Sequence, residues 1–313
     1  MEIPDTEGDK HAKNECIRIV TMAHKSGFVN ILGKPNVGKS TLMNLLVGER
    51  LSIITAKAQT TRHRIHGILN TPDYQIVFSD TPGILDPTYK LQEAMLKAAR
   101  TALQDADIII YLTEVKEKPD PTNEFILKLT KLKVPILLLI NKIDLSNQSK
   151  LEKIVEEWNT IFPDAEKIPI SALENFNVDY VFKRIVANLP EGPPYYPKDQ
   201  LTDKSERFFT GEFIREKILL HYKQEIPYSV EIEIESFKEA EHLINIRAII
   251  YVERDSQKGI LIGNDGLALK KVGREARIEM ETFFNKKVFL ELYVKVNKDW
   301  RNNERQVRKF GYR

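Results

Sequence analysis

The chain contains a single cysteine, Cys16, among its 313 residues, so no disulfide can form within it. This fits a reducing cytosol, although a secreted protein without disulfides would look the same. The longest apolar runs, such as residues 136–140, are far shorter than the ~20 residues that a membrane-spanning helix needs. The net charge of +2 neither favours nor excludes a nucleic-acid partner. With 42% hydrophobic and 29% charged residues, the composition excludes a disordered or fibrous protein.

The beginning of the chain also lacks the apolar stretch of a secretory signal, and four of its first nine residues are acidic. We expect residues 1–24 to form a disordered leader. Met22, just before the first apolar run, is a candidate for the natural start.

The next part of the chain alternates short apolar runs with helical patterns, which is typical of an α/β fold with a mostly parallel sheet covered by helices on both faces. Strands are expected at residues 28–32, 64–69, 74–79, 107–112, 134–140 and 167–170, and helices at 39–46, 89–104, 123–131, 150–161 and 178–189. Four prolines and a glycine in residues 190–197 end this pattern. We therefore predict a first domain at 25–190, a linker at 191–203 and a smaller α+β domain at 204–313.

The first domain carries a phosphate-binding motif, G-x-x-x-x-G-K-S, from Gly33 to Ser40. It follows an expected strand and opens a helix. Two glycines let backbone N–H groups surround phosphate oxygens, and the helix N-terminus adds partial positive charge. Lys39 would contact the β- and γ-phosphates, and the Ser40 hydroxyl would bind Mg²⁺.

Two further motifs follow strands of the same sheet. Asp80 opens Asp-Thr-Pro-Gly, where the carboxylate can bind Mg²⁺ and the Gly83 N–H can sense the γ-phosphate. Asn141-Lys-Ile-Asp144 determines the base, because the Asp144 carboxylate can accept two hydrogen bonds from guanine but not from adenine. The predicted GTP-binding residues are Gly33, Lys34, Pro35, Asn36, Val37, Gly38, Lys39, Ser40, Thr41, Asp80, Thr81, Pro82, Gly83, Ile84, Asn141, Lys142, Asp144, Ser171, Ala172 and Leu173.

Gln59-Thr-Thr-Arg62 lies between the phosphate-loop helix and the next strand. A threonine here could bind Mg²⁺ and sense the γ-phosphate, and the sequence does not separate Thr60 from Thr61. The expected metal ligands are Ser40, Thr60, Thr61 and Asp80.

These motifs, each at a strand end, resemble translation-factor-type GTPases. Residues 57–68, together with Asp-Thr-Pro-Gly-Ile at 80–84, resemble the Era-like GTPase family, and the resemblance covers about residues 26–313. Ile84 occupies a position where many GTPases carry a water-orienting glutamine, so hydrolysis should be slow without an activator. The resemblance implies a potassium ion at Asn36, and the catalytic residues would be Lys39, Asn36, Thr60 and Thr61; for Asn36 simple turn chemistry is an equal alternative.

The second domain contains Gly263-Asn-Asp-Gly266 before a basic helix, and its element order resembles the type II KH domain that ends Era-like GTPases. A G-x-x-G loop lets a single RNA strand approach closely. Residues 286–313 hold nine bases against three acids, with aromatic residues for base stacking. The predicted RNA-binding residues are Gly259, Ile260, Ile262, Gly263, Asn264, Asp265, Gly266, Lys270, Lys271, Arg274, Arg277, Trp300, Arg301 and Arg305.

The resemblance implies a GTP- and GDP-binding switch that hydrolyses GTP, uses Mg²⁺, binds small-subunit ribosomal RNA near its 3′ end and assists assembly of the small ribosomal subunit. It also implies a cytoplasmic monomer with peripheral contact at the inner face of the membrane. The alternatives are an RNA-binding scaffold whose first domain only senses the nucleotide, or a tRNA-modification GTPase.

Overall fold

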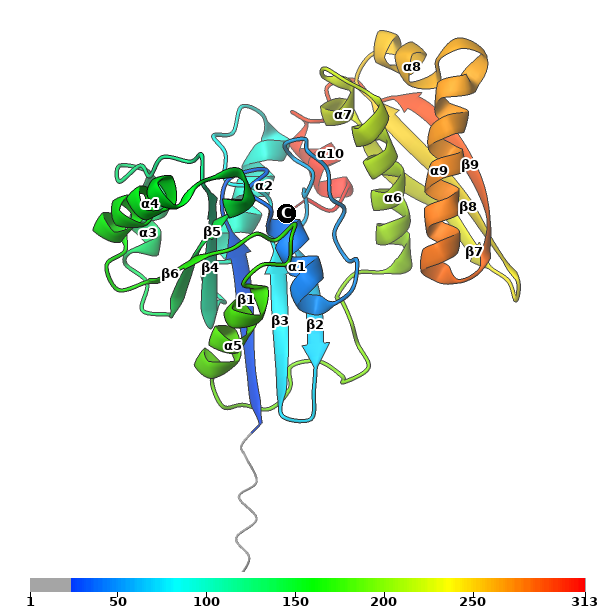
Figure 1. The fold of residues 1–313 in the computed structure, drawn as a ribbon. Helices are drawn as coiled ribbons and strands as arrows, with labels where there is room; N and C mark the ends of the chain where they lie inside the picture. Colours follow the sequence, from blue (N-terminus) through cyan, green and yellow to red (C-terminus); the bar gives the residue numbers. More distant parts are fainter. Residues whose placement is uncertain (1–23, 313) are drawn as a thin grey trace, which may run out of the picture.

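The computed structural model describes residues 24–312, so the expected leader, with Met22, lies outside this part of the chain except for His24. The described residues form two domains that lie side by side (Figure 1). Among residues 24–312, no helix combines the length and apolar character needed to cross a bilayer.

The first domain is built on a six-stranded sheet with the order β2-β3-β1-β4-β5-β6, in which only β2 runs antiparallel to its neighbour. The strands are β1 (Lys25–Leu32), β2 (Ile65–Asn70), β3 (Tyr74–Asp80), β4 (Ile108–Glu114), β5 (Ile136–Asn141) and β6 (Glu166–Pro169). β4 begins with Ile-Ile-Ile-Tyr-Leu, and all five side chains are buried. Such a continuous apolar run is expected for a strand covered on both faces, which confirms the predicted fold class.

Helices cover both faces of this sheet. They are α1 (Lys39–Val47), α2 (Lys90–Thr101), α3 (Glu124–Leu129), the short 3₁₀ helix η1 (Ile143–Leu145), α4 (Gln148–Ile161) and α5 (Val178–Asn188). On one face Ile31 belongs to a core with Leu42 of α1 and Val181 of α5. On the other face Leu32 belongs to a core with residues of α3 and α4. Successive side chains of β1 therefore point to opposite faces of the sheet and pack into two different hydrophobic cores.

The second domain has a three-stranded sheet with the order β7-β8-β9. Its elements are α6 (Glu206–His221), α7 (Ile226–Ser229), β7 (Glu231–Glu239), β8 (Leu243–Val252), α8 (Asp255–Ile262), η2 (Asn264–Gly266), α9 (Leu267–Phe284), β9 (Lys287–Val296) and α10 (Glu304–Lys309). β7 and β8 are antiparallel, whereas β8 and β9 are parallel. The sequence did not resolve the short helices α7, α8 and α10, which have four, eight and six residues and therefore show little helical periodicity.

The predicted linker, residues 191–203, lies along the edge of the first sheet. The N–H of Ile68 donates to the Leu201 carbonyl at 2.8 Å, and Thr202 forms an isolated bridge with Gly67. The Gln75 side chain accepts hydrogen bonds from the N–H groups of Tyr195 and Tyr196. The segment is therefore attached to the first domain along most of its length.

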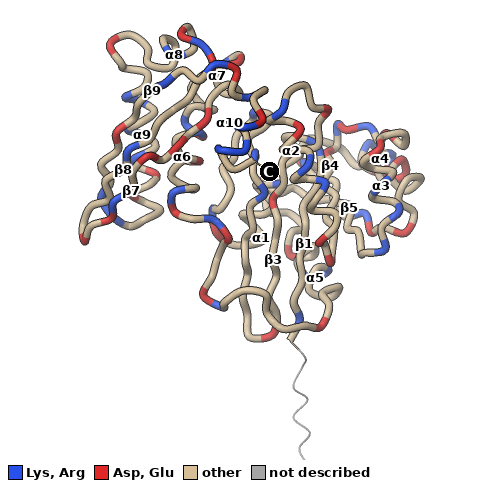
Figure 2. Tube along the Cα trace, turned by 180° about the vertical axis from the view of Figure 1, so that it is seen from behind, with Lys and Arg blue, Asp and Glu red and all other residues tan. Residues whose placement is uncertain are grey.

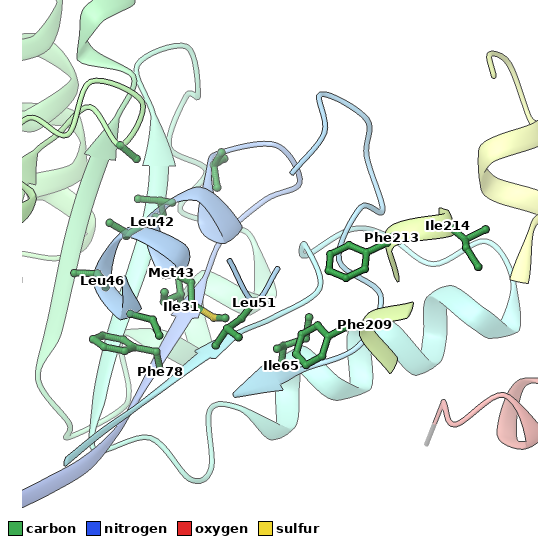
Figure 3. Close-up of a cluster of buried hydrophobic side chains, with 14 of the residues drawn as sticks. Ile31, Leu42, Met43, Leu46, Leu51, Ile65, Phe78, Phe209, Phe213 and Ile214 are labelled. Carbon is green, nitrogen blue, oxygen red and sulfur yellow. The ribbon is translucent and has the colours of Figure 1, made fainter. Parts of the chain in front are cut away.

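A hydrophobic cluster continues from the first domain into the second. Leu51 and Ile65 of the first domain belong to the same cluster as Phe209, Phe213 and Ile214 of α6 (Figure 3). α6 thus packs against the first domain on one side and against its own sheet on the other, which explains why ten of its residues are buried.

The C-terminal segment returns to the first domain and lies beside α2 (Figure 1). Trp300, Val307 and Tyr312 form a small buried cluster with Leu91 and Met95 of α2. This contact joins the two domains at a place separate from residues 191–203 and from the packing of α6.

Candidate functional site

The phosphate loop, residues 33–40, connects β1 to α1. A Cβ atom on Gly33 would lie 2.1 Å from the Leu112 carbonyl oxygen, so only glycine fits. Lys39 Nζ donates to the Gly33 carbonyl at 3.2 Å and to the Lys34 carbonyl at 2.8 Å. Burial lowers the pKa of Lys39 to about 8, against the opposing effect of the Asp80 carboxylate. This lysine is therefore desolvated and held at the floor of a cavity of about 420 Å³.

Three oxygen-bearing side chains meet beside this lysine. Asp80 Oδ2 accepts hydrogen bonds from Ser40 Oγ at 2.7 Å and from Thr61 Oγ1 at 3.1 Å, and the two hydroxyl oxygens lie 2.9 Å apart. Asp80 Oδ1 is buried and has no hydrogen-bond partner within residues 24–312. Burial raises the pKa of Asp80. A hard cation with oxygen ligands would satisfy the orphaned carboxylate oxygen, so the donor set fits Mg²⁺.

The structure separates the two threonines that the sequence left open. Thr61 Oγ1 faces Ser40 and Asp80. Thr60 Oγ1 instead donates to the Lys57 carbonyl at 2.6 Å and lies 2.7 Å from Thr55 Oγ1. The expectation that Thr60 is a metal ligand is therefore wrong in this arrangement, although Thr60 does line the cavity.

At the other end of the cavity, Asn141 ties the guanine-specificity loop to the phosphate loop. Its Nδ2 donates to the Val37 carbonyl at 2.7 Å, and its Oδ1 accepts from the Ala172 N–H at 2.9 Å. Asp144 Oδ1 accepts from Ser171 Oγ at 2.6 Å, which orients the carboxylate. The loops after β5 and β6 are thus joined by side chains that the motifs predicted.

The Asp-Thr-Pro-Gly loop lies close against the phosphate loop. A Cβ atom on Gly83 would be 2.7 Å from the Pro35 nitrogen, and the Ile84 N–H donates to the Gly33 carbonyl at 3.1 Å. The Ile84 side chain packs against the core on the α3 and α4 face of the sheet, so it cannot orient water. Thr81 is also structural, because its hydroxyl donates to the Ile31 carbonyl at 2.7 Å.

Most of the predicted residues line one cavity, namely Pro35, Asn36, Gly38, Lys39, Ser40, Thr41, Thr60, Thr61, Gly83, Asn141, Lys142, Asp144, Ala172 and Leu173. Gly33, Val37, Asp80, Pro82 and Ser171 are buried and do not line this cavity. Lys34 points elsewhere and pairs with Glu117 at 3.0 Å. The prediction missed Ile53, Ile54, Thr55, Ala56, Gln59 and Leu145, which complete the wall. Apart from its position before Thr60, the segment 53–56 carries no motif that could have revealed it.

The G-x-x-G loop connects α8 to α9. Gly263 has φ +70°, and a Cβ atom there would lie 2.6 Å from Ala268 Cβ, so a side chain would both strain and crowd the turn. Gly266 has φ +74° but open space around it. Asn264 and Asp265, between the two glycines, are exposed. The sugar–phosphate backbone of an RNA strand could therefore approach this loop closely.

The surroundings of this loop combine apolar and basic surface. Ile260 is 54% exposed, whereas Ile262 packs partly against the core. Gly259, Lys270, Lys271 and Arg274 are exposed, and Arg277 pairs with Glu281 at 3.2 Å. Over the domain as a whole, basic and acidic residues are interspersed (Figure 2). The basic surface suited to RNA is therefore local to the start of α9.

The C-terminal tail does not offer the stacking surface that its composition suggested. Trp300 is 0% exposed, and its indole N–H donates to the Ser229 carbonyl at 2.9 Å. Arg301 forms an ion pair with Glu253, and its guanidinium lies 4.8 Å from the centre of the Tyr89 ring. The prediction that Trp300 stacks on RNA bases is therefore wrong, whereas Arg301 is partly exposed and its contact with RNA stays a prediction. Arg305 is exposed.

The fold and the site together define a P-loop GTPase domain joined to a KH domain. A family model described as "50S ribosome-binding GTPase" matches residues 28–142, and a KH domain model matches residues 225–301. The chain is 39% identical to Era crystallised with MgGDPNP and nucleotides 1506–1542 of 16S ribosomal RNA. The match covers 92% of this chain and 99% of that one, with a TM-score of 0.88. A variant of Aquifex aeolicus Era bound to GDP and AlF4⁻ gives the same identity, coverage and TM-score. The protein belongs to the Era family of GTPases.

Proposed function

We propose that this protein is a Mg²⁺-dependent GTPase that binds small-subunit ribosomal RNA near its 3′ end through its KH domain and assists assembly of the small ribosomal subunit. The observation that carries the proposal is that Lys39, Ser40, Thr61 and Asp144 line one cavity, while Asp80 accepts hydrogen bonds from the Ser40 and Thr61 hydroxyls. The related Era crystallised with an RNA fragment supports the ribosomal part.

The residues divide the chemistry among them. Backbone N–H groups of the phosphate loop and the Lys39 ammonium hold the phosphates, and Asp144 selects guanine. Ser40, Thr61 and Asp80 would hold Mg²⁺, which neutralises charge on the phosphate oxygens when bound. The Ile84 side chain cannot orient the attacking water, so intrinsic GTP hydrolysis should be slow.

We extend the proposal to potassium. Asn36 is exposed at the cavity and its Nδ2 donates to the Ala56 carbonyl at 3.0 Å, so it bridges the phosphate loop and the segment before Thr60. A monovalent cation beside it would supply positive charge in the transition state, in a site where Ile84 cannot orient the attacking water. The proposal also includes the small subunit as partner, a monomeric state, and a cytoplasmic location with peripheral contact at the inner face of the membrane. These four rest on the family resemblance alone.

The test of RNA binding uses a matched pair at Gly266, where the left-handed backbone tolerates Asn and Asp alike. Labelled RNA from the 3′ end of the small-subunit rRNA is titrated against the parent, Gly266→Asn and Gly266→Asp proteins. We expect Gly266→Asp to bind about tenfold more weakly than Gly266→Asn, because a carboxylate would then face the RNA phosphates. Equal affinities of the two variants, with intact circular dichroism, would place the RNA surface elsewhere.

Two alternative functions compete with the proposed one. A nucleotide-sensing scaffold would bind GTP and RNA without turning over GTP, so single-turnover hydrolysis with and without potassium separates it from the proposal. A tRNA-modification GTPase would prefer tRNA over rRNA fragments in the same titration.

A further inference from the structure

The segment of residues 50–64, here called the switch segment, carries the wall of the nucleotide cavity and the Thr61 hydroxyl. The second domain holds this segment at several points. Lys57 Nζ donates to the Leu219 and Tyr222 carbonyls at the end of α6, and Arg50 pairs with Glu216 at 2.5 Å. A loop that senses the nucleotide is therefore anchored by the RNA-binding domain.

The contacts closest to Thr61 come from a buried arginine of α6. Arg215 is 2% exposed, and its guanidinium donates to the carbonyl oxygens of Gln59, at 3.4 Å, and Thr60. Glu212, one turn earlier on α6, accepts from Arg215 Nε at 2.8 Å and also from Nη2. This paired arrangement fixes the plane of the guanidinium, because a carboxylate and a guanidinium match at two points.

Arg62 makes a reciprocal contact on the other side of Thr61. Its side chain is fully buried in the second domain and donates to the Val230 carbonyl at 2.7 Å and the Pro227 carbonyl at 3.1 Å. The KH domain therefore holds the chain on both sides of Thr61. It binds the carbonyl groups of Gln59 and Thr60 before it and the side chain of Arg62 after it.

We infer that Arg215 is a positioning residue for the Thr61 hydroxyl, so that the KH domain completes the Mg²⁺-binding arrangement of the G domain. The inference rests on the proposed function. In GTPases the switch threonine is engaged when the γ-phosphate and Mg²⁺ are both present, and it is released with the diphosphate. Arg215 therefore stabilises the triphosphate complex and leaves the diphosphate complex unchanged.

The test compares full-length parent protein with Arg215→Lys, which keeps the charge but cannot donate in a planar fork. Equilibrium affinities are measured for a fluorescent non-hydrolysable GTP analogue and for fluorescent GDP, each over a Mg²⁺ titration. We expect Arg215→Lys to weaken the analogue about tenfold, as for the loss of one charge-assisted hydrogen bond, with GDP affinity unchanged. The matched control is Arg207→Lys on the exposed side of the same helix.

A double-mutant cycle with Thr61→Ala identifies the route of the effect. If Arg215 acts through Thr61, Arg215→Lys weakens the analogue in the parent background but not in the Thr61→Ala background. Equal losses in both backgrounds, or a parallel loss of GDP binding, would show that Arg215 is merely structural and would overturn the inference.

A second variant covers the case in which Arg215→Lys does not fold. Glu212→Gln releases the guanidinium from its fixed plane and should give the same selective loss; unchanged analogue affinity there contradicts the inference. Failure of the parent itself to bind the analogue would instead reject the proposed function.

Discussion

The His63 ring lies stacked on the Tyr312 ring, with centroids 4.2 Å apart and planes inclined by 15°. This pair joins the switch segment to the last part of the described chain. The Tyr312 hydroxyl donates to Glu231 Oε2 at 2.8 Å, and the same carboxylate oxygen lies 3.3 Å from Arg62 Nη1. A buried polar cluster therefore links residues that are far apart in sequence, and His63 lies within it.

Burial of His63 makes the stability of the protein depend on pH. Burial lowers its pKa from 6.5 to about 4; the Glu212 carboxylate opposes this shift, whereas the charges of Arg215 and Lys204 add to it. As the pH falls from 6.5 to 4, the unfolded chain takes up this proton and the folded chain does not, so stability decreases, by about 3 kcal/mol at most. His63→Phe keeps the stack and should remove this part of the slope in denaturant titrations. The same slope in His63→Phe as in the exposed control His242→Phe would contradict the expectation.

Guanine recognition should depend on the Asp144 carboxylate. Asp144→Asn removes the acceptor for two hydrogen bonds and should weaken GTP and GDP about 100-fold while improving xanthosine nucleotides. The measurement is competition between the two nucleotide types, with Asp179→Asn, an exposed carboxylate nearby on α5, as control. Comparable affinities of the parent for ATP and GTP would defeat the assignment of the loop.

The pKa of Lys39 gives nucleotide binding its own pH dependence. Burial holds this pKa at about 8 in the free protein, and bound phosphates favour the ammonium form. Above pH 8 the neutral lysine must therefore take up a proton on binding, and GTP affinity should fall as the pH rises. Calorimetry in two buffers of different ionisation enthalpy measures the uptake. Lys39→Met should bind GTP weakly and without this proton uptake. The surface variant Lys128→Met should behave as the parent protein does. Proton uptake that persists in Lys39→Met would assign the uptake to another group.

Potassium, if held at Asn36, should matter only when that side chain is present. Replacing K⁺ by Na⁺ should slow single-turnover GTP hydrolysis by the parent about tenfold, which corresponds to ~1.4 kcal/mol of transition-state stabilisation. In Asn36→Ala the two salts should give nearly equal, slow rates. Equal rates in the parent would remove potassium from the proposal.

The sequence predicted those site residues whose role is imposed by the local backbone. Gly33 and Gly38 are required by positive φ angles and close contacts, and the strand ends that carry Asp80 and Asn141 follow from apolar runs. The sequence did not distinguish Thr60 from Thr61, because adjacent residues in a loop without regular structure can point in either direction.

The errors arose where contacts between the two domains cover side chains that local patterns leave exposed. Glu231 alternates with the apolar Val230 and Ile232, a pattern typical of a solvent-facing side chain, yet it is 7% exposed because Arg62 and Tyr312 cover it. Trp300 lies in a basic, aromatic stretch typical of RNA-binding tails, and only the tertiary contact with α2 shows that it is core. Composition does not record such long-range packing.

Residues 191–203 connect the two domains covalently, and the C-terminal segment on α2 and the packing of α6 join them again at separate places. Two domains joined only by a linker can hinge freely about it, whereas these domains can move relative to each other only where all of these contacts allow it. A single proteolytic cut within 191–203 would consequently leave two fragments that still copurify, held by the aromatic cluster around Trp300 and by the buried arginines.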